Sequence, residues 1–276
     1  MTDSRSNKVA FIGAGNMNSA IILGLLNSGV APTNIIVSNP SSEKRVALTE
    51  QYGIANTADN IAAAEFADTI VLGVKPHLIA SVCQQLAEKL NLTNKCFISV
   101  AAGTTVAQIQ QALGNKLPVI RTMPNTPSQL GLGVSGIYPS SEVTEEQKAT
   151  ADNLMKAVGI VKWLKTEEEI DYIIAVSGSG PAYFFLFMEA MEQQAKTLGF
   201  TAQESRELVQ QTALGAAKMV IENQIPIKQL RDNVTSKGGT TQAALSSFID
   251  DGLPQLVTNA MNAALHRAKE MAQNNT

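Results

Sequence analysis

The chain has 276 residues, 45% of them hydrophobic, and a formal net charge of −3 at pH 7. This length favours two ordinary domains over one large one, and the acidic balance, with basic residues scattered along the chain, argues against a nucleic-acid partner. Cys83 and Cys96 are too few for a disulfide framework, and the polar opening from Met1 to Asn7 has no apolar targeting segment. We therefore expect a soluble, cytoplasmic protein without a membrane partner.

The first predicted element is a strand that leads through a glycine turn into a helix. Residues 8–12 form a short apolar run, the turn follows from Gly13 to Asn18, and apolar residues then recur at helical spacing. Such a turn lets the backbone approach a pyrophosphate, and the N–H groups at the helix start favour its negative charge. Asn18 replaces the third glycine of the dinucleotide fingerprint, so a connection that binds no ligand remains the alternative.

Up to about residue 164, short apolar runs continue to alternate with helical patterns. The further candidate strands are 35–37, 69–72, 96–100 and 119–121, and two candidate helices are 43–52 and 106–113. This alternation predicts an α/β fold with a Rossmann-type parallel sheet covered by helices on both faces. In such sheets, ligands bind beyond the carboxyl ends of the strands.

The second predicted strand ends in Ser38-Asn39, where a dinucleotide fold that uses NAD normally carries an acid. Neutral hydrogen-bonding groups accept a 2′-phosphate that an acid would repel, and Lys44 or Arg45 lies close enough in the sequence to contribute. The pattern therefore favours NADP. A simple turn at Ser38-Asn39-Pro40 is the alternative.

Three further segments lie at predicted strand ends. Val74-Lys75-Pro76 places a lysine at the carboxyl edge of the sheet, and 101–103 are small residues that let a flat nicotinamide ring approach the backbone. A solvated lysine is the alternative for the first segment, and close helix packing explains the second equally well. The proline-stiffened segment 121–127 is neither helix nor central strand and suits the wall of a pocket.

After Trp163 the strand signal fades, and the rest of the chain predicts an all-helical domain. The expected helices are 167–176, 181–198, 202–223, 239–251 and 254–273, with a domain boundary near residue 165. Pro181 suits the first turn of its helix. Residues 184–188 make that helix apolar on nearly every side, which favours a subunit interface, whereas the run is too short for a membrane span.

The loop from Thr235 to Thr241 combines two adjacent glycines with flanking hydroxyl groups just before a predicted helix. Gly238, Gly239, Thr240 and Thr241 together offer N–H groups and a hydroxyl to a small carboxylate. An ordinary turn or helix cap is the alternative. The two histidines, His77 and His266, lie far apart in the sequence, and no metal site or nucleophile triad is indicated.

Taken together and in this order, the motifs closely resemble those of the pyrroline-5-carboxylate reductase family, from about residue 8 to 273. They are Phe-Ile-Gly-Ala-Gly-Asn-Met (11–17), Val-Lys-Pro (74–76), Ala-Ala-Gly (101–103), Arg-x-Met-Pro-Asn-Thr-Pro (121–127), Ser-Gly-Ser-Gly-Pro-Ala-Tyr (177–183) and Asp-Asn-Val-Thr-Ser-Lys-Gly-Gly-Thr-Thr (232–241).

The resemblance implies a Rossmann domain at 1–165 and a helical substrate-binding and dimerisation domain at 166–276. It implies reduction of the cyclic imine 1-pyrroline-5-carboxylate to L-proline, the last step of proline biosynthesis, by hydride transfer from NADPH, with NADH also usable. It further implies a homodimer, with larger rings of dimers known in the family.

The resemblance also assigns the site residues. Gly13, Gly15, Asn16 and Met17 hold the pyrophosphate; Ser38, Asn39 and Asn60 the adenosine ribose; and Val74, Lys75, Ala101 and Asn233 the nicotinamide half. Ser236, Gly239, Thr240 and Thr241 bind the substrate carboxylate, with the Thr241 hydroxyl near the ring nitrogen as the catalytic group.

Three positions depart from the family pattern. Asn18 stands where a small residue is more usual, Lys237 where proline is expected, and Thr240 where alanine also occurs.

Two other interpretations remain open. One is a hydroxyacid or imine reductase of the same plan with another substrate, which an acid at position 38 and a catalytic helix lysine would favour; Lys196 and Lys218 fit better as helix surface residues. The other is a dinucleotide-binding sensor without turnover, which would not need the 232–241 loop.

Overall fold

A computed structural model describes residues 8–274 of the chain. It contains two compact units: the first comprises the described residues up to Ser179 and those from Ala264 onward, and the second comprises Gly180–Ala263.

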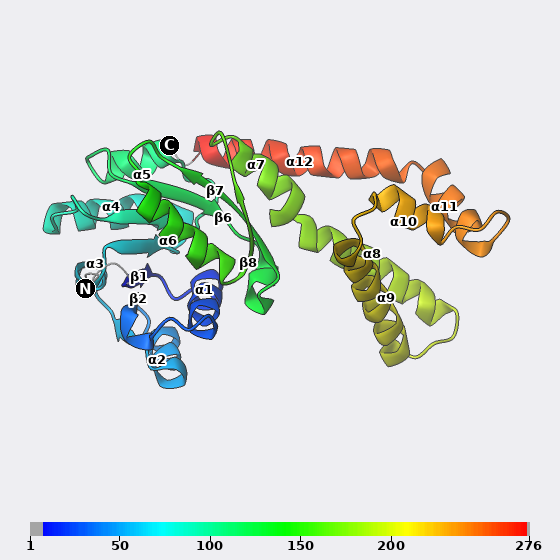
Figure 1. Ribbon diagram of the computed structural model, residues 1–276, viewed down its shortest axis with the longest axis horizontal. Helices are drawn as coiled ribbons and strands as arrows, with labels where there is room; N and C mark the ends of the chain where they lie inside the picture. Colours follow the sequence, from blue (N-terminus) through cyan, green and yellow to red (C-terminus); the bar gives the residue numbers. More distant parts are fainter. Residues whose placement is uncertain (1–7, 275–276) are drawn as a thin grey trace. The chain divides into compact units, whose positions relative to one another are not determined.

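The first unit is built on an eight-stranded sheet with the strand order β3-β2-β1-β4-β5-β6-β7-β8 (Figure 1). All neighbouring strands are parallel except β6 and β7, which are antiparallel. The strands are β1 (Val9–Ile12), β2 (Ile35–Ser38), β3 (Ala55–Thr57), β4 (Thr69–Leu72), β5 (Cys96–Ser99), β6 (Val119–Met123), β7 (Gly133–Pro139) and β8 (Gly159–Trp163). The predicted α/β class and the five predicted strands are therefore confirmed.

Helices cover both faces of this sheet, as the uninterrupted apolar strands require. The neighbours Phe11 and Ile12 on β1 point to opposite faces and enter two separate hydrophobic clusters, one that includes Ile22 and Leu154 and another that includes Leu86. The helices of this part are α1 (Asn16–Asn27), α2 (Ser42–Tyr52), α3 (Asn60–Phe66), α4 (Pro76–Lys89), α5 (Val106–Ala112) and α6 (Glu145–Lys156), with short 3₁₀ turns at Pro32–Asn34 and Thr126–Leu130.

One continuous helical stretch, Glu169–Thr197, follows the sheet. It consists of α7 (Glu169–Ile173), a π-helical turn (Ile174–Gly178) and α8 (Gly180–Thr197). The sequence predicted helices at 167–176 and 181–198, with Pro181 in the first turn of the second. Pro181 does lie in the first turn of α8, but the prediction missed the π turn that joins α7 to α8. The wider π turn lets the chain accommodate the proline without ending the helix.

The loop after β6 is attached to this π turn by Asn125. Its Nδ2 donates to the backbone oxygen of Ser177 at 2.9 Å, and its Oδ1 accepts from the N–H of Val134 at 2.8 Å. Because Pro181 has no N–H, the carbonyl of Ser177 lacks its usual partner four residues later and is available to Asn125. The segments 121–127 and 177–183, which the sequence analysis singled out separately, are therefore connected by a hydrogen bond.

Ion pairs and hydrogen bonds attach the turn before α7 to its neighbours in the first unit. The Arg121 Nη1 on β6 donates to Glu167 Oε1 at 3.0 Å, and the Val106 N–H of α5 donates to the same oxygen at 2.8 Å. Lys269, near the carboxyl end of the last helix, pairs with Glu168 at 2.7 Å. These contacts hold the turn before α7 beside β6, α5 and the last turns of α12.

These contacts explain why the first compact unit extends to Ser179, beyond the domain boundary expected near residue 165. Residues 166–179 and 264–274 belong to the first unit.

The second unit consists of α8, α9 (Ala202–Glu222), α10 (Ile227–Asn233), α11 (Thr240–Asp250) and the first part of α12 (Leu253–Asn274). Thr201 begins α9 with a capping box in which its hydroxyl accepts from the Glu204 N–H. Helices α8 and α9 pack on each other, yet large apolar side chains remain exposed on both. Among them are Phe184 (69% exposed) and Phe185 (63%) on α8 and Leu208 and Leu214 on α9.

Candidate functional site

The predicted pyrophosphate turn joins the carboxyl end of β1 to α1. Gly13 has φ of +100°, and a Cβ there would lie 2.8 Å from the backbone oxygen of Gly73 at the end of β4. Only glycine suits both conditions. Gly15 is the N-cap of α1, and no side chain of the described residues caps its first turn, so the N–H groups there are available to an anion.

Ser38, the last residue of β2, and the following Asn39 both contact this turn. Asn39 Oδ1 accepts from the N–H of Ala14 at 3.2 Å, and the N–H of Gly13 donates to the Ser38 backbone oxygen at 2.8 Å. The Ser38 hydroxyl donates to Asn60 Oδ1 at 2.7 Å, which links the ends of β2 and α3. The structure therefore brings together the three residues predicted for the ribose side.

The two basic residues of α2 have different surroundings. Arg45 Nη1 donates to Asn56 Oδ1 on β3 at 2.5 Å, so its guanidinium is engaged inside the unit. Lys44 is exposed in the first turn of α2, and its ammonium has no hydrogen-bond or ion-pair partner within residues 8–274. Of the two, Lys44 is the cation that remains available to a phosphate.

Three of the four residues predicted for the nicotinamide half lie after β4 and β5. Val74 is half-buried and Lys75 exposed, and Lys75 is the N-cap of α4 with Pro76 in the first turn. Ala101 is 6% exposed, and its N–H donates to the Ser99 hydroxyl at 3.3 Å. The predicted pyrophosphate turn approaches this region at Gly13, where a Cβ would lie 3.1 Å from the Val74 nitrogen.

The predicted carboxylate loop lies in the second unit, before α11. Gly238 has φ of +74°, and Gly239 is the N-cap of α11, with its N–H donating to the Ser236 oxygen at 3.0 Å. A Cβ at Gly239 would lie 2.4 Å from the Ser236 hydroxyl oxygen, so a larger residue there would force the Ser236 side chain to move. Thr240 and Thr241 form the uncapped first turn, and across the described chain the exposed Thr241 hydroxyl has no partner.

The sequence analysis did not predict a role for Gln242, which lies in the first turn of α11 and contacts this loop. Its Oε1 accepts from the N–H of Gly238 at 2.6 Å and thereby fixes the left-handed glycine before the helix. A glutamine three residues after an N-cap is a known back-bonding position, so the signal was present in the sequence.

Asn233, predicted near the nicotinamide, ends α10. Its Oδ1 accepts from Gln229 Nε2 at 2.9 Å. It lies with Ser236, Gly239, Thr240 and Thr241 in the second unit, whereas the other predicted cofactor residues lie in the first.

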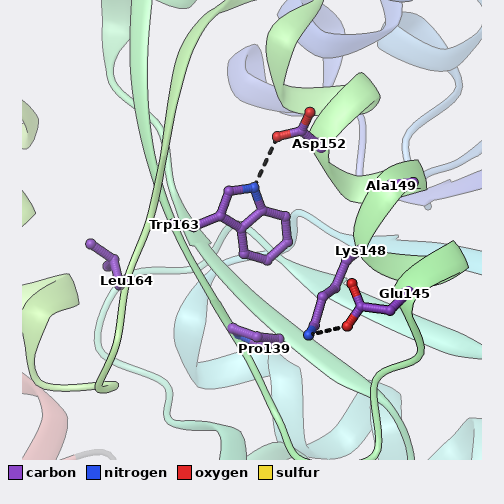
Figure 2. Close-up of a pocket in the computed structure, with 7 residues that line it drawn as sticks. All are labelled: Pro139, Glu145, Lys148, Ala149, Asp152, Trp163 and Leu164. Carbon is purple, nitrogen blue, oxygen red and sulfur yellow. Dashed lines mark hydrogen bonds and ion pairs between the residues drawn. The ribbon is translucent and has the colours of Figure 1, made fainter.

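A separate groove of about 530 Å³ lies beside β8 and α6 and contains none of the predicted site residues (Figure 2). Its polar groups are paired: Trp163 Nε1 donates to Asp152 Oδ1 at 2.9 Å, and Lys148 pairs with Glu145 at 2.7 Å. The hydrogen bond from Lys156 is the main cause that lowers the pKa of Asp152. These pairings leave the groove without an evident group for chemistry.

The structure can also be searched for a metal site and for a helix that could span a membrane. Within the part of the chain that the structure describes, no three histidine, cysteine, aspartate or glutamate side chains are placed to hold a metal ion. Glu169–Thr197 is long and apolar enough to cross a membrane by length and composition, with a mean hydropathy of 1.3 over its most apolar 18 residues. The expectation that this apolar region is too short is corrected, because α7 and α8 join into one stretch.

Two family models match the chain. The model described as pyrroline-5-carboxylate reductase dimerisation matches residues 167–271, and the model described as NADP oxidoreductase coenzyme F420-dependent matches residues 8–103.

Relatives match over nearly the whole chain. A pyrroline-5-carboxylate reductase of Vibrio alginolyticus is 51% identical, with 96% of this chain and 97% of the relative covered, and one of Pseudomonas aeruginosa is 43% identical with the same coverage. The solved structure of a pyrroline-5-carboxylate reductase from Coxiella burnetii superposes with a TM-score of 0.92 at 42% identity, covering 97% of this chain and 99% of the other. That of Plasmodium falciparum pyrroline carboxylate reductase with NADP bound gives 0.86 at 29% identity, with the same coverage of 97% and 99%.

Proposed function

Because the chain belongs to the pyrroline-5-carboxylate reductase family, whose reaction is the last step of proline biosynthesis, we propose that NADPH binds at the turn Gly13–Met17 and the imine substrate at 236–241. The observation that carries the cofactor assignment is the glycine turn itself. Its close approach to Gly73 and the uncapped start of α1 fit the pyrophosphate of a dinucleotide.

The adenosine end would lie against the carboxyl ends of β2 and β3. Ser38, Asn39 and Asn60 would hold the ribose, and Lys44 at the start of α2 would pair with a 2′-phosphate. Lys44 supports NADPH over NADH because, within residues 8–274, its exposed ammonium has no partner of its own. Val74, Lys75, Ala101 and Asn233 would hold the nicotinamide half.

Reversing the charge at Lys44 tests the cofactor preference. Lys44→Glu is expected to raise the KM for NADPH about tenfold, equivalent to about 1.4 kcal/mol, because a carboxylate replaces the ammonium beside the phosphate. The KM for NADH is expected to stay within about twofold. Lys116→Glu, an exposed lysine before β6, changes the net charge equally and should leave both values unchanged. An equal rise for both cofactors would remove Lys44 from the 2′-phosphate site.

The substrate loop would act by position. The first-turn N–H groups of α11 and the Ser236 hydroxyl would hold the carboxylate, and the Thr241 hydroxyl would orient the ring nitrogen. A protonated imine is already an electrophile, so the residues mainly need to hold it in place. When bound, the reduced nicotinamide supplies the hydride.

The exposed apolar face of α8 and α9 supports a homodimer. The dimerisation family model covers both helices, and a second copy of the chain would bury side chains such as Phe184 and Phe185. We propose this copy, rather than a membrane, as the cover. A ring of such dimers, a cytoplasmic location and the lack of a nucleic-acid partner complete the proposal.

Charging this face tests the dimer. The double substitution Phe184→Glu and Phe185→Glu is expected to convert the protein to monomers at micromolar concentration, because two carboxylates would have to be buried unpaired. Light scattering after size exclusion measures the mass. Leu130→Glu, a residue that is 78% exposed outside the dimerisation match, serves as control and should leave the mass unchanged. A double variant with the wild-type mass would contradict the assignment of this face.

A further inference from the structure

Asn18, the residue that replaces the third glycine of the fingerprint, is buried at 1% exposure on the first turns of α1. Its Nδ2 donates to the backbone oxygen of Gly13 at 2.7 Å and lies 3.4 Å from that of Ile12. Its Oδ1 is buried and has no partner within the described chain. The short contact to a carbonyl oxygen fixes which end of the carboxamide is nitrogen.

A second asparagine side chain binds the opposite side of the peptide group between Gly13 and Ala14. The carbonyl of Gly13 and the N–H of Ala14 belong to one peptide unit, and Asn39 Oδ1 accepts from that N–H at 3.2 Å. Asn18 and Asn39 therefore clamp the Gly13–Ala14 peptide on opposite sides. This peptide directly precedes Gly15, where the free N–H groups of the turn begin.

The Asn18 carboxamide also packs on Gly73 at the end of β4. A Cβ at Gly73 would lie 2.3 Å from Asn18 Nδ2 and Oδ1 and 2.4 Å from its Cγ, so the three nearest atoms all belong to this carboxamide. The Gly73 N–H meanwhile donates to the Ile12 oxygen at 2.9 Å. Asn18 thus touches both the turn after β1 and the segment that leads to Val74 and Lys75.

We propose that Asn18 is a positioning residue for the dinucleotide: it orients the Gly13–Ala14 peptide and sets the spacing between the glycine turn and the β4 end, with Gly73 as its matched partner. This inference rests on the proposed function of the turn. Asn18 acts through the backbone, because at 1% exposure it is hidden from a bound cofactor.

The chemistry of the carboxamide supports this role over simple packing. An alanine would bury no unpaired oxygen, whereas the Asn18 Oδ1 is buried without a partner within the described chain, a feature that costs free energy in the folded protein. Retaining such a group is typical of sites where geometry matters for a ligand.

The test measures the Kd of NADPH by fluorescence together with kcat and the KM for NADPH. Asn18→Ala is expected to raise Kd and KM about five- to tenfold with kcat within about twofold at saturating NADPH, since the turn loses its orientation while the substrate loop is untouched. Asn18→Asp is expected to bind more weakly still, because its carboxylate cannot donate to the Gly13 oxygen. Asn27→Ala, an exposed residue at the end of the same helix, is the control and should match wild type.

A double-mutant cycle tests the pairing with Gly73. Gly73→Ala is expected to weaken NADPH binding at least about tenfold in the wild-type background, and to have less than about a twofold effect when Asn18→Ala is already present. If Gly73→Ala alone does not fold, recovery of a folded double variant supports the same pairing.

Three outcomes overturn separate parts of this proposal. Wild-type NADPH affinity in Asn18→Ala, with only a lower melting temperature, would make Asn18 a structural residue and overturn the inference. An equal penalty for Gly73→Ala in both backgrounds would overturn the pairing. Failure of the wild-type protein to bind NADPH would instead refute the proposed function, and the inference with it.

Discussion

Arg121→Met is expected to destabilise the first unit by about 3 kcal/mol. The Arg121 guanidinium on β6 is 3% exposed and pairs with Glu167 at 3.0 Å and, more distantly, with Asp171 at 4.0 Å. Removing this cation leaves two carboxylates without their positive partner beside the sheet. Burial already raises the pKa of Asp171, and the charge of Arg121 opposes that rise. Loss of the arginine therefore leaves the buried Asp171 carboxylate still less favourable in its charged form.

The single tryptophan provides the measurement, because Trp163 lies on β8 and its fluorescence reports unfolding of the first unit in urea. Arg267→Met is the control: this arginine belongs to an exposed pair with Glu270 on α12, for which the expected change is below about 1 kcal/mol. Adding Asp171→Asn to Arg121→Met is expected to recover part of the loss, since the uncompensated charge is removed. Equal destabilisation by the two arginine substitutions would show that Arg121 is no more than a surface ion pair.

Thr241→Val is expected to lower kcat/KM for the imine about a hundredfold, or about 2.7 kcal/mol. The substitution keeps the shape of the side chain and removes the hydroxyl that is exposed and, within residues 8–274, unpartnered at the start of α11. The proposed role is to orient the ring nitrogen, so kcat should fall together with kcat/KM, while the Kd of NADPH stays within about twofold.

Two further variants make this experiment specific. Thr241→Ser keeps the hydroxyl and is expected to retain most of the activity. Ser246→Ala removes an exposed hydroxyl from the same helix and should be indistinguishable from wild type. A Thr241→Val enzyme within about threefold of wild-type efficiency would exclude the hydroxyl from the reaction.

The sequence predicted those strands whose burial made them continuous apolar runs. β1, β2, β4 and β5 are buried along all or nearly all of their length, and each was recognised. β3 is three residues long and partly exposed, so it carries no such run. β7 contains glycines that the fold needs for close packing: a Cβ at Gly136 would lie 2.7 Å from Ile173. Glycine usually signals a loop, so this strand could not be recognised from its composition.

The sequence placed Pro181 correctly in the first turn of α8, but it did not predict that α7 continues into α8 through a π turn. Local rules place proline at a helix start, whereas the π turn and the bond from Asn125 to the Ser177 oxygen allow the helix to continue. That bond joins residues 52 positions apart in the chain. Local propensity contains no information about such a contact.

In the candidate site, the glycine turn and the carboxylate loop could be predicted from the sequence, because their glycines are needed for the local backbone conformation. The roles of Asn18 and Gln242 were not predicted. Asn18 was noticed as a departure from the fingerprint, but its clamp on Gly13 and its packing on Gly73 arise only when β1 and β4 lie side by side.

The measurement that tests the central claim most directly is oxidation of NADPH, and separately of NADH, by the purified wild-type protein with and without 1-pyrroline-5-carboxylate, with L-proline quantified in the same samples. We expect imine-dependent oxidation with one proline formed for each NADPH consumed, and a higher kcat/KM with NADPH than with NADH. A folded protein that binds NADPH but forms no proline from the imine would contradict the claim.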